Sequence, residues 1–352
     1  MNNFKKIGLT ALAGSLAAIS ANAIELSVSG TTSVSYNSQS GTGLAANPSI
    51  ATGGNSIGVD TGIAFNGSGE LENGFTVSTF AALDDGRANT LSSSQLTLGM
   101  GSLGTVVFAQ QFGTAANGID DVTPKVHEEA FDQAGGSVLQ SFGVQTAQGA
   151  VTYKSPTIEV EGVSVSFAVD YDPAANATSD DHDGTTTKAI GQGSGTAAVV
   201  KVATDLGLTV GAGIEQLSGD AKYQDKENVT AYVLYSMGPV SVGYQAYYLD
   251  NGDGTANTDV TTATADYSGE SYSIAFNVND NLSLSYGEIN ETKEEASATL
   301  ATDRDITSIT AAYSAGGMTI AVQQTDTDNY TMAAAASALD VENTHVTLSF
   351  AF

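Results

Sequence analysis

The sequence predicts an all-β fold: a closed, antiparallel transmembrane β-barrel of 16 strands with short periplasmic turns and long external loops. First, segments of about ten residues alternate apolar and small polar side chains, which is typical of strands whose two faces meet different environments. Second, the connections between these segments alternate between short and long. Third, no stretch after residue 23 approaches the ~18 consecutive apolar residues of a transmembrane helix, so a spanning form of this chain must be a barrel.

The first 23 residues are expected to be a signal peptide. Lys5 and Lys6 precede an apolar run at 7–19, and Ala21-Asn22-Ala23 supplies the small residues of a cleavage site. The run is too short to span a bilayer, and the alternative is an ordinary N-terminal helix. Cleavage would leave residues 24–352 as a single barrel domain.

Sixteen segments in order show the strand pattern. They are 24–36, 56–67, 74–83, 93–100, 105–111, 147–156, 162–171, 196–204, 208–217, 228–237, 239–249, 270–278, 282–291, 306–314, 318–325 and 343–352. In the segment 162–171, for example, Val163, Val165, Phe167, Val169 and Tyr171 alternate with Ser164, Ser166, Ala168 and Asp170. Gly, Ser, Thr, Ala, Gln and Asp dominate the second face, whereas a soluble β-protein would bury large apolar residues there. The pattern therefore predicts a polar interior and an apolar exterior.

The connections support the same arrangement. Short ones lie at 69–74, 101–104, 156–162, 205–207, 238–239, 279–281 and 315–317. Long, polar and acidic ones lie at 37–55, 84–92, 112–146, 172–195, 218–227, 250–269, 292–305 and 326–342. A membrane barrel has this asymmetry between its two ends, and an even number of strands brings the termini together so that the sheet can close.

The composition excludes several classes of protein. The chain contains 39 acidic and 11 basic residues, two of which are in the expected signal, so the remainder has nine basic residues and a formal charge of −30. Such a surface repels nucleic acid and attracts cations, although solubility or adaptation to salt also accounts for acidic loops. The absence of cysteine excludes disulfides, thiol catalysis and cysteine metal sites.

No catalytic constellation is evident, so an enzyme is not expected. The three histidines, His127, His182 and His345, are far apart in the sequence, and no nucleophile elbow, phosphate loop or zinc-binding helix is present. No cofactor is expected. Carboxylates in the loops at 180–183 and 250–253 offer oxygen ligands for Ca²⁺, but neither fits the twelve-position calcium loop, and solvated charge is the alternative.

Three places in the chain resemble the Gram-negative general-diffusion porins, closest in style to the sixteen-stranded alphaproteobacterial kind. The C-terminal strand 345–352 (HVTLSFAF) is similar to the assembly signal of such barrels, which ends in phenylalanine. The hairpin at 94–108 resembles the one before the family's third loop, and 151–167, with Tyr153-Lys154-Ser155-Pro156, resembles the one after it. The resemblance implies a homotrimer in the outer membrane of a Gram-negative bacterium, with lipid around it and small hydrophilic solutes passing through it.

Two features depart from the family pattern. An arginine is common in the family where this chain has Gln110 or Gln111, which puts the usual strong field across the pore in doubt. Tryptophan is absent, so any aromatic girdle must come from tyrosine and phenylalanine.

The resemblance also implies where a pore would be narrowed. In the family the third external loop folds into the barrel, and here that loop is 112–146, the longest connection; an ordinary exposed loop is the alternative. Strand parity points Lys154 and Lys201 inward, as pore charges or as solvated groups near the rim, and Asp60, Asp170 and Glu215 share this inward parity. The residues expected at the constriction are Asp120, Asp121, Glu128, Glu129, Asp132, Lys154, Lys201 and Asp60.

The sequence thus predicts a passive diffusion channel for ions and small hydrophilic solutes that prefers cations. A substrate-selective channel is an alternative, although it would need a ladder of inward aromatics, and parity offers only Phe80, Tyr232 and Tyr247. A non-pore surface adhesin is a further alternative, but it would not need the small polar face or the terminal Phe352.

Overall fold

The computed structural model describes residues 25–42, 56–83, 91–110, 114–131, 137, 142–143, 149–173, 175, 192–219, 225–251, 265–294, 302–332 and 339–352. The expected signal peptide therefore lies outside the described residues. Within them no helix is long and apolar enough to cross a membrane.

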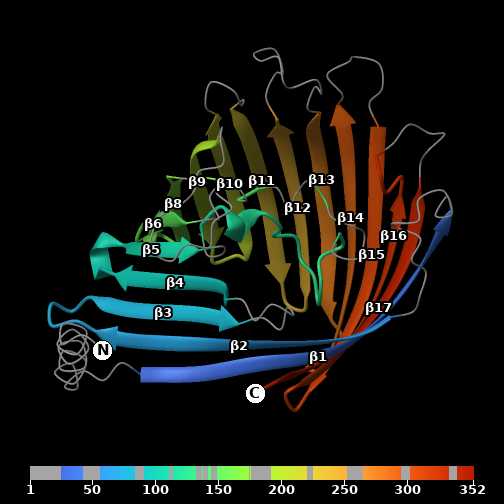
Figure 1. Cartoon of the computed structure of the whole chain (residues 1–352), viewed down its shortest axis with the longest axis horizontal. Helices are drawn as coiled ribbons and strands as arrows, with labels where there is room; N and C mark the ends of the chain where they lie inside the picture. The colour runs from blue at the N-terminus through green and yellow to red at the C-terminus, as the bar shows by residue number, and fades with distance from the viewer. Residues whose placement is uncertain are drawn as a thin grey trace, which may run out of the picture.

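The described chain is a single antiparallel sheet (Figure 1). Its strands are β1 (Glu25–Thr42), β2 (Ser56–Glu70), β3 (Thr76–Leu83), β4 (Leu91–Gly99), β5 (Thr105–Gln110), β6 (Ala150–Lys154), β7 (Ile158–Val160), β8 (Val163–Asp172), β9 (Gln192–Thr204), β10 (Leu208–Gly219), β11 (Lys226–Met237), β12 (Val240–Asp250), β13 (Asp266–Asn277), β14 (Leu282–Glu294), β15 (Thr302–Ala315), β16 (Met318–Asp328) and β17 (Asp340–Ala351). Both β6 and β7 pair with β8, so the wall has 16 strand positions. Because β1 pairs with β2 and with β17, the sheet closes, and the predicted 16-stranded barrel is confirmed.

The interruption between β6 and β7 corrects the expected strand 147–156 and the expected turn 156–162. Pro156 has no N–H to give to the ladder. Beside it, the Ser155 hydroxyl accepts the Phe167 N–H at 2.9 Å, so a side chain satisfies this N–H where the ladder is interrupted. Lys154 lies opposite Ala168 but Ile158 lies opposite Val165, so this strand carries one extra residue, a bulge. The extra residue moves the side chains that follow it to the opposite face of the sheet, so Ile158 points outward. The turn itself is formed by Glu161 and Gly162, both with positive φ (49° and 82°).

The two faces of the wall differ as the sequence predicts. Large apolar side chains such as Val59, Phe167 and Ile320 are exposed on the outside. Thr152, Thr230 and others of the opposite parity are buried on the inside. The residue pairs that lie directly opposite each other share a face, so the register extends this division around the barrel.

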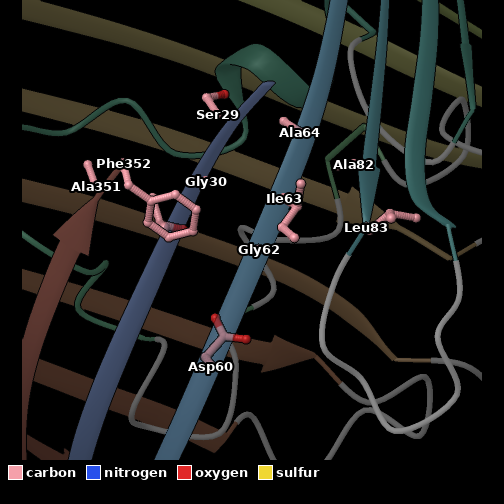
Figure 2. A pocket seen from close by; sticks show the side chains of 11 residues that line it. Ser29, Gly30, Asp60, Gly62, Ile63, Ala64, Ala82, Leu83, Ala351 and Phe352 are labelled. Atoms are coloured by element: carbon pink, nitrogen blue, oxygen red, sulfur yellow. The ribbon is translucent and has the colours of Figure 1, made fainter. Parts of the chain in front are cut away.

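The barrel closes at a seam between the two ends of the chain. Gly30 and Phe352 exchange two backbone hydrogen bonds, of 2.8 and 2.9 Å. The Phe352 ring lies over Gly30, where a Cβ atom would come within 2.6 Å of it (Figure 2). The depression around this ring is floored by small residues of β1–β3, among them Gly62 and Ala82. Glycine at position 30 therefore lets the C-terminal ring pack flat against the first strand.

Several strands extend beyond their expected limits, and mostly at their external ends. β1 continues to Thr42, β13 begins at Asp266 and β15 begins at Thr302. The apolar alternation stops where the outer face leaves lipid, but backbone pairing does not depend on apolar side chains. The sequence pattern therefore marks the lipid-facing band more closely than it marks the ends of the strands.

Candidate functional site

The described part of the long connection between β5 and β6 lies inside the barrel. Figure 1 shows this green segment running between β1–β5 on one side and β10–β16 on the other. Its hydrogen bonds reach inward-facing side chains of β8, β10, β12, β13, β14 and β16. We refer to residues 114–131, 137 and 142–143 as the inner loop.

Buried carboxylates hold the two ends of the inner loop. The carboxylate of Asp170 accepts the N–H groups of Ala115 and Ala116 at 3.0 and 2.8 Å, just before a short 3-10 turn at Asn117–Ile119. On β10, Glu215 accepts the Gly143 N–H at 2.9 Å. Asp170 and Glu215 were expected to face inward, which is confirmed, but both are almost fully buried. Such charge-assisted bonds are stronger than neutral ones, so these acids serve to attach the loop.

Gln245 of β12 clamps the centre of the inner loop. Its Oε1 accepts the Val122 N–H at 3.1 Å, while its Nε2 donates to the carbonyls of Ile119 and Asp120 at 2.9 and 3.1 Å. The same Nε2 lies 2.8 Å from the Thr230 hydroxyl, which fixes the orientation of the amide. The side chain is fully buried, so each of these bonds replaces one to water.

Further along, hydroxyl and amide groups continue the attachment. Ser273 donates to the Pro124 carbonyl at 2.6 Å, and the Ser285 hydroxyl accepts the Val126 N–H at 3.3 Å. On β16, the Gln323 Nε2 donates to the Glu129 carbonyl at 3.0 Å. The inner loop is therefore fastened to the wall strand by strand.

Apolar contacts fill the space between the inner loop and the wall. One cluster joins Ala116, Ile119 and Phe142 of the loop to Ala197 and Tyr232 of the wall.

The second apolar cluster joins Phe131 to Tyr247, Ile289 and Ile306. Burial of such side chains contributes roughly 1.5–3 kcal/mol each. Two of the three aromatics that parity points inward, Tyr232 and Tyr247, are thus covered by the loop rather than open to the lumen.

A buried ionic network lies beside the second cluster. The Arg304 guanidinium contacts the Glu291 carboxylate, with its Nε at 2.7 Å. Glu291 also accepts the Tyr247 hydroxyl at 2.6 Å and contacts the Ser137 hydroxyl of the inner loop. Arg304 further donates to the Tyr330 carbonyl at 3.3 Å, which ties in the segment after β16. Removing one partner would leave a buried charge uncompensated.

Three of the predicted acids, Asp120, Asp121 and Glu129, come together on the inner loop around one lysine, while Glu128 lies beside His127. Lys125 lies 3.1 Å from Asp121 and also contacts Glu129. Burial raises the pKa of Asp120 to about 6, although its hydrogen bond with the Asp121 N–H opposes the rise. Burial also raises the pKa of Asp121, against the opposing effect of Lys125. For Lys125, burial lowers the pKa, but Asp121 and Glu129 outweigh it and raise the value overall. Lys125 therefore stays charged and is shared by two carboxylates.

The other predicted site residues lie apart from this group. Asp60 on β2, Lys154 on β6 and Lys201 on β9 are exposed at inward positions of the register. Among the described residues, Lys154 and Lys201 form no ion pair with the loop acids. Asp132 lies outside the described residues, as does the acidic stretch 180–183 considered for Ca²⁺. In the part of the chain that the structure describes, no three metal-ligating side chains are grouped for an ion.

The sequence did not single out Gln245, Gln323, Glu291 or Arg304. A signal was present, because each is a long polar side chain on the inward parity of a strand otherwise rich in small residues. Gln245, Gln323 and Glu291 bond to a loop more than 100 residues earlier. Arg304 acts through Glu291, so the role of all four was visible only in the folded chain.

The comparisons with known proteins agree with this architecture. The model of the Gram-negative porin family matches residues 8–283. A comparison of the sequence with curated proteins finds no match.

Solved structures similar to this chain include the trimer form of OmpT from Vibrio cholerae, with 12% identity over 94% of this chain and 100% of that one, at a TM-score of 0.64. They also include an anion-selective porin from Comamonas acidovorans (12% identity, 94% and 100% coverage, TM-score 0.63) and OmpF of Salmonella typhi in complex with daunomycin (13% identity, 94% and 98% coverage, TM-score 0.64). These identities support the fold, and the family match supports the outer-membrane location. The chain belongs to the Gram-negative porin family and is an outer-membrane diffusion channel.

Proposed function

We propose that the segment 112–146 narrows the lumen and that the channel passes ions and small hydrophilic solutes with a preference for cations. Narrowing is supported by the position of the inner loop, whose backbone is fastened to the inward face of at least six strands. A segment held on the inside of the wall occupies cross-section that would otherwise be open to solute. Its many buried hydrogen bonds make this position a stable one.

The preference for cations rests on the charges that the inner loop carries. Asp120, Asp121, Glu128 and Glu129 are opposed there by Lys125, which two of these acids share. Acidic side chains at a constriction favour cations. The fold does not decide this sign, because the structurally similar porin from Comamonas acidovorans is anion-selective. The loop acids are therefore the observation that carries the proposal.

Reversal potentials across a planar bilayer with a salt gradient test the proposal. We expect the purified protein to prefer K⁺ over Cl⁻, and the double variant Asp120→Asn/Glu128→Gln to lose roughly half or more of that preference. A matched double variant, Asp280→Asn/Glu161→Gln, removes the same charge from periplasmic turns and should change the ratio little. Anion preference of the unmodified protein, or equal losses in both variants, would overturn the assignment.

We further propose that the channel is a homotrimer, and that residues 1–23 are a signal peptide that directs export and is cleaved after Ala23. The apolar outer face can meet lipid or another subunit, and one structurally similar porin is described as a trimer. The native mass in detergent, compared with the mass after heat unfolding, tests the assembly. N-terminal sequencing of the protein from outer membranes tests the cleavage.

A further inference from the structure

One patch of the inner wall presents an aromatic ring that the inner loop does not cover. Phe80 of β3 lines a cavity together with Ser27, Asn66, Ser78 and Gln95. The other wall aromatics expected to face inward, Tyr232 and Tyr247, are packed beneath the loop. A large apolar side chain on a water-facing wall is unusual, because it gains nothing from packing there.

The register places an amide on each side of this ring. Asn66 of β2 and Gln95 of β4 both lie directly opposite Phe80. Neighbouring strands are about 4.8 Å apart, so the two amides flank the ring across roughly 10 Å. A ring of pyranose size resting on Phe80 would be within reach of both amides.

These amides differ from the other long polar side chains of the inner wall. Gln245 and Gln323 bond to the inner loop, and Asn228 bonds to Glu215. In the described part of the chain, the side chains of Asn66 and Gln95 make no hydrogen bond. Their donors and acceptors are therefore available to a solute, and they stand on either side of an apolar surface.

We propose that Phe80, Asn66 and Gln95 form a subsite for neutral polyhydroxylated solutes such as sugars. This inference rests on the proposed aqueous lumen. The face of an aromatic ring accommodates the C–H groups of a sugar, while amides bond its hydroxyls as both donors and acceptors.

The charges and the location of the cavity define the subsite further. Among the described residues that line the cavity none is basic, and Glu25 supplies the one carboxylate, which disfavours anions. The cavity is built from the ends of β2, β3 and β4 next to the turns at 71–75 and 100–104, which places the subsite near the periplasmic mouth.

Current noise in planar bilayers tests the subsite. With maltose or maltotriose added to a steadily conducting channel, we expect concentration-dependent excess noise that saturates. Phe80→Ala should raise the half-saturating sugar concentration about tenfold, and Asn66→Ala or Gln95→Ala should raise it severalfold. The matched control is Phe65→Ala, which removes the same side chain from the outward position next to Asn66 and should leave the noise unchanged.

The outcomes separate this inference from the proposed function. If the protein carries no current, the channel function itself fails. If it conducts but maltose and maltotriose produce no saturable noise, the subsite is refuted, as it is if Phe80→Ala behaves like the unmodified protein. Phe80→Leu keeps an apolar side chain without an aromatic face, so it should also lose affinity; it serves if the alanine variant does not fold.

Discussion

Acidification is expected to loosen the inner loop from β17 through a pair of stacked histidines. His127 of the loop and His345 of the wall have ring centroids 6.3 Å apart, with an angle of 28° between the ring planes. The Nε2 of His127 and the Nδ1 of His345 are buried and have no hydrogen-bond partner among the residues that the structure describes. Across the sheet, His345 faces the neutral side chains Asn37 and Gln323.

The size of the effect follows from this geometry. Two positive charges 6.3 Å apart repel by ~2.6 kcal/mol at an effective dielectric constant of about 20. Glu128, whose carboxylate is 3.6 Å from the His127 Nε2, can offset the first charge but not both. Charging both rings would therefore shift the equilibrium between the attached and detached states of this part of the loop toward detachment by up to roughly 70-fold.

Single-channel conductance recorded as the pH is lowered stepwise reports on this pair, because only the state with both rings charged carries the repulsion. We expect the unmodified channel to change conductance or to fluctuate at the acidic end. His127→Gln and His345→Gln should each abolish that response, and the double variant should add nothing, because either single change removes the repulsion. Retention of the full response in either single variant would refute the reasoning.

Three further predictions concern the loop charges, the loop clamp and the seam. Because the pKa of Asp120 is raised to about 6, cation preference measured by reversal potential should fall as the pH drops through 6, and Asp120→Asn should lose that step. Gln245→Leu leaves three backbone groups of the loop unpaired, which costs about 1–3 kcal/mol each. This variant should therefore show more conductance noise and more protease cleavage within the loop. An unchanged current recording would contradict the role of Gln245 in holding the loop. Gly30→Ala, which brings a Cβ within 2.6 Å of the Phe352 ring, should destabilise the barrel by about 1–3 kcal/mol in heat-dependent gel mobility, and Phe352→Leu should partly restore it.

Local pattern was sufficient to predict the wall. Alternation with a period of two assigns each side chain to one face, and closure leaves no freedom to exchange the two faces without exposing polar groups to lipid. The inward orientation of Asp170 and Glu215 and the number of strand positions followed from the sequence for this reason. The bulge at Pro156 did not, because one extra residue shows itself only against the register of the neighbouring strand.

The tertiary structure alone decided what the inward groups do. His127 and His345 are separated by most of the chain, as are Gln323 and the loop carbonyls that it binds, and no periodicity relates such residues. Parity placed Asp170 and Glu215 on the inward face, but their role as buried attachment points for the loop is visible only in the folded chain. Orientation toward one face is a local property of a strand, whereas contact with a loop that crosses the barrel depends on closure of the whole sheet.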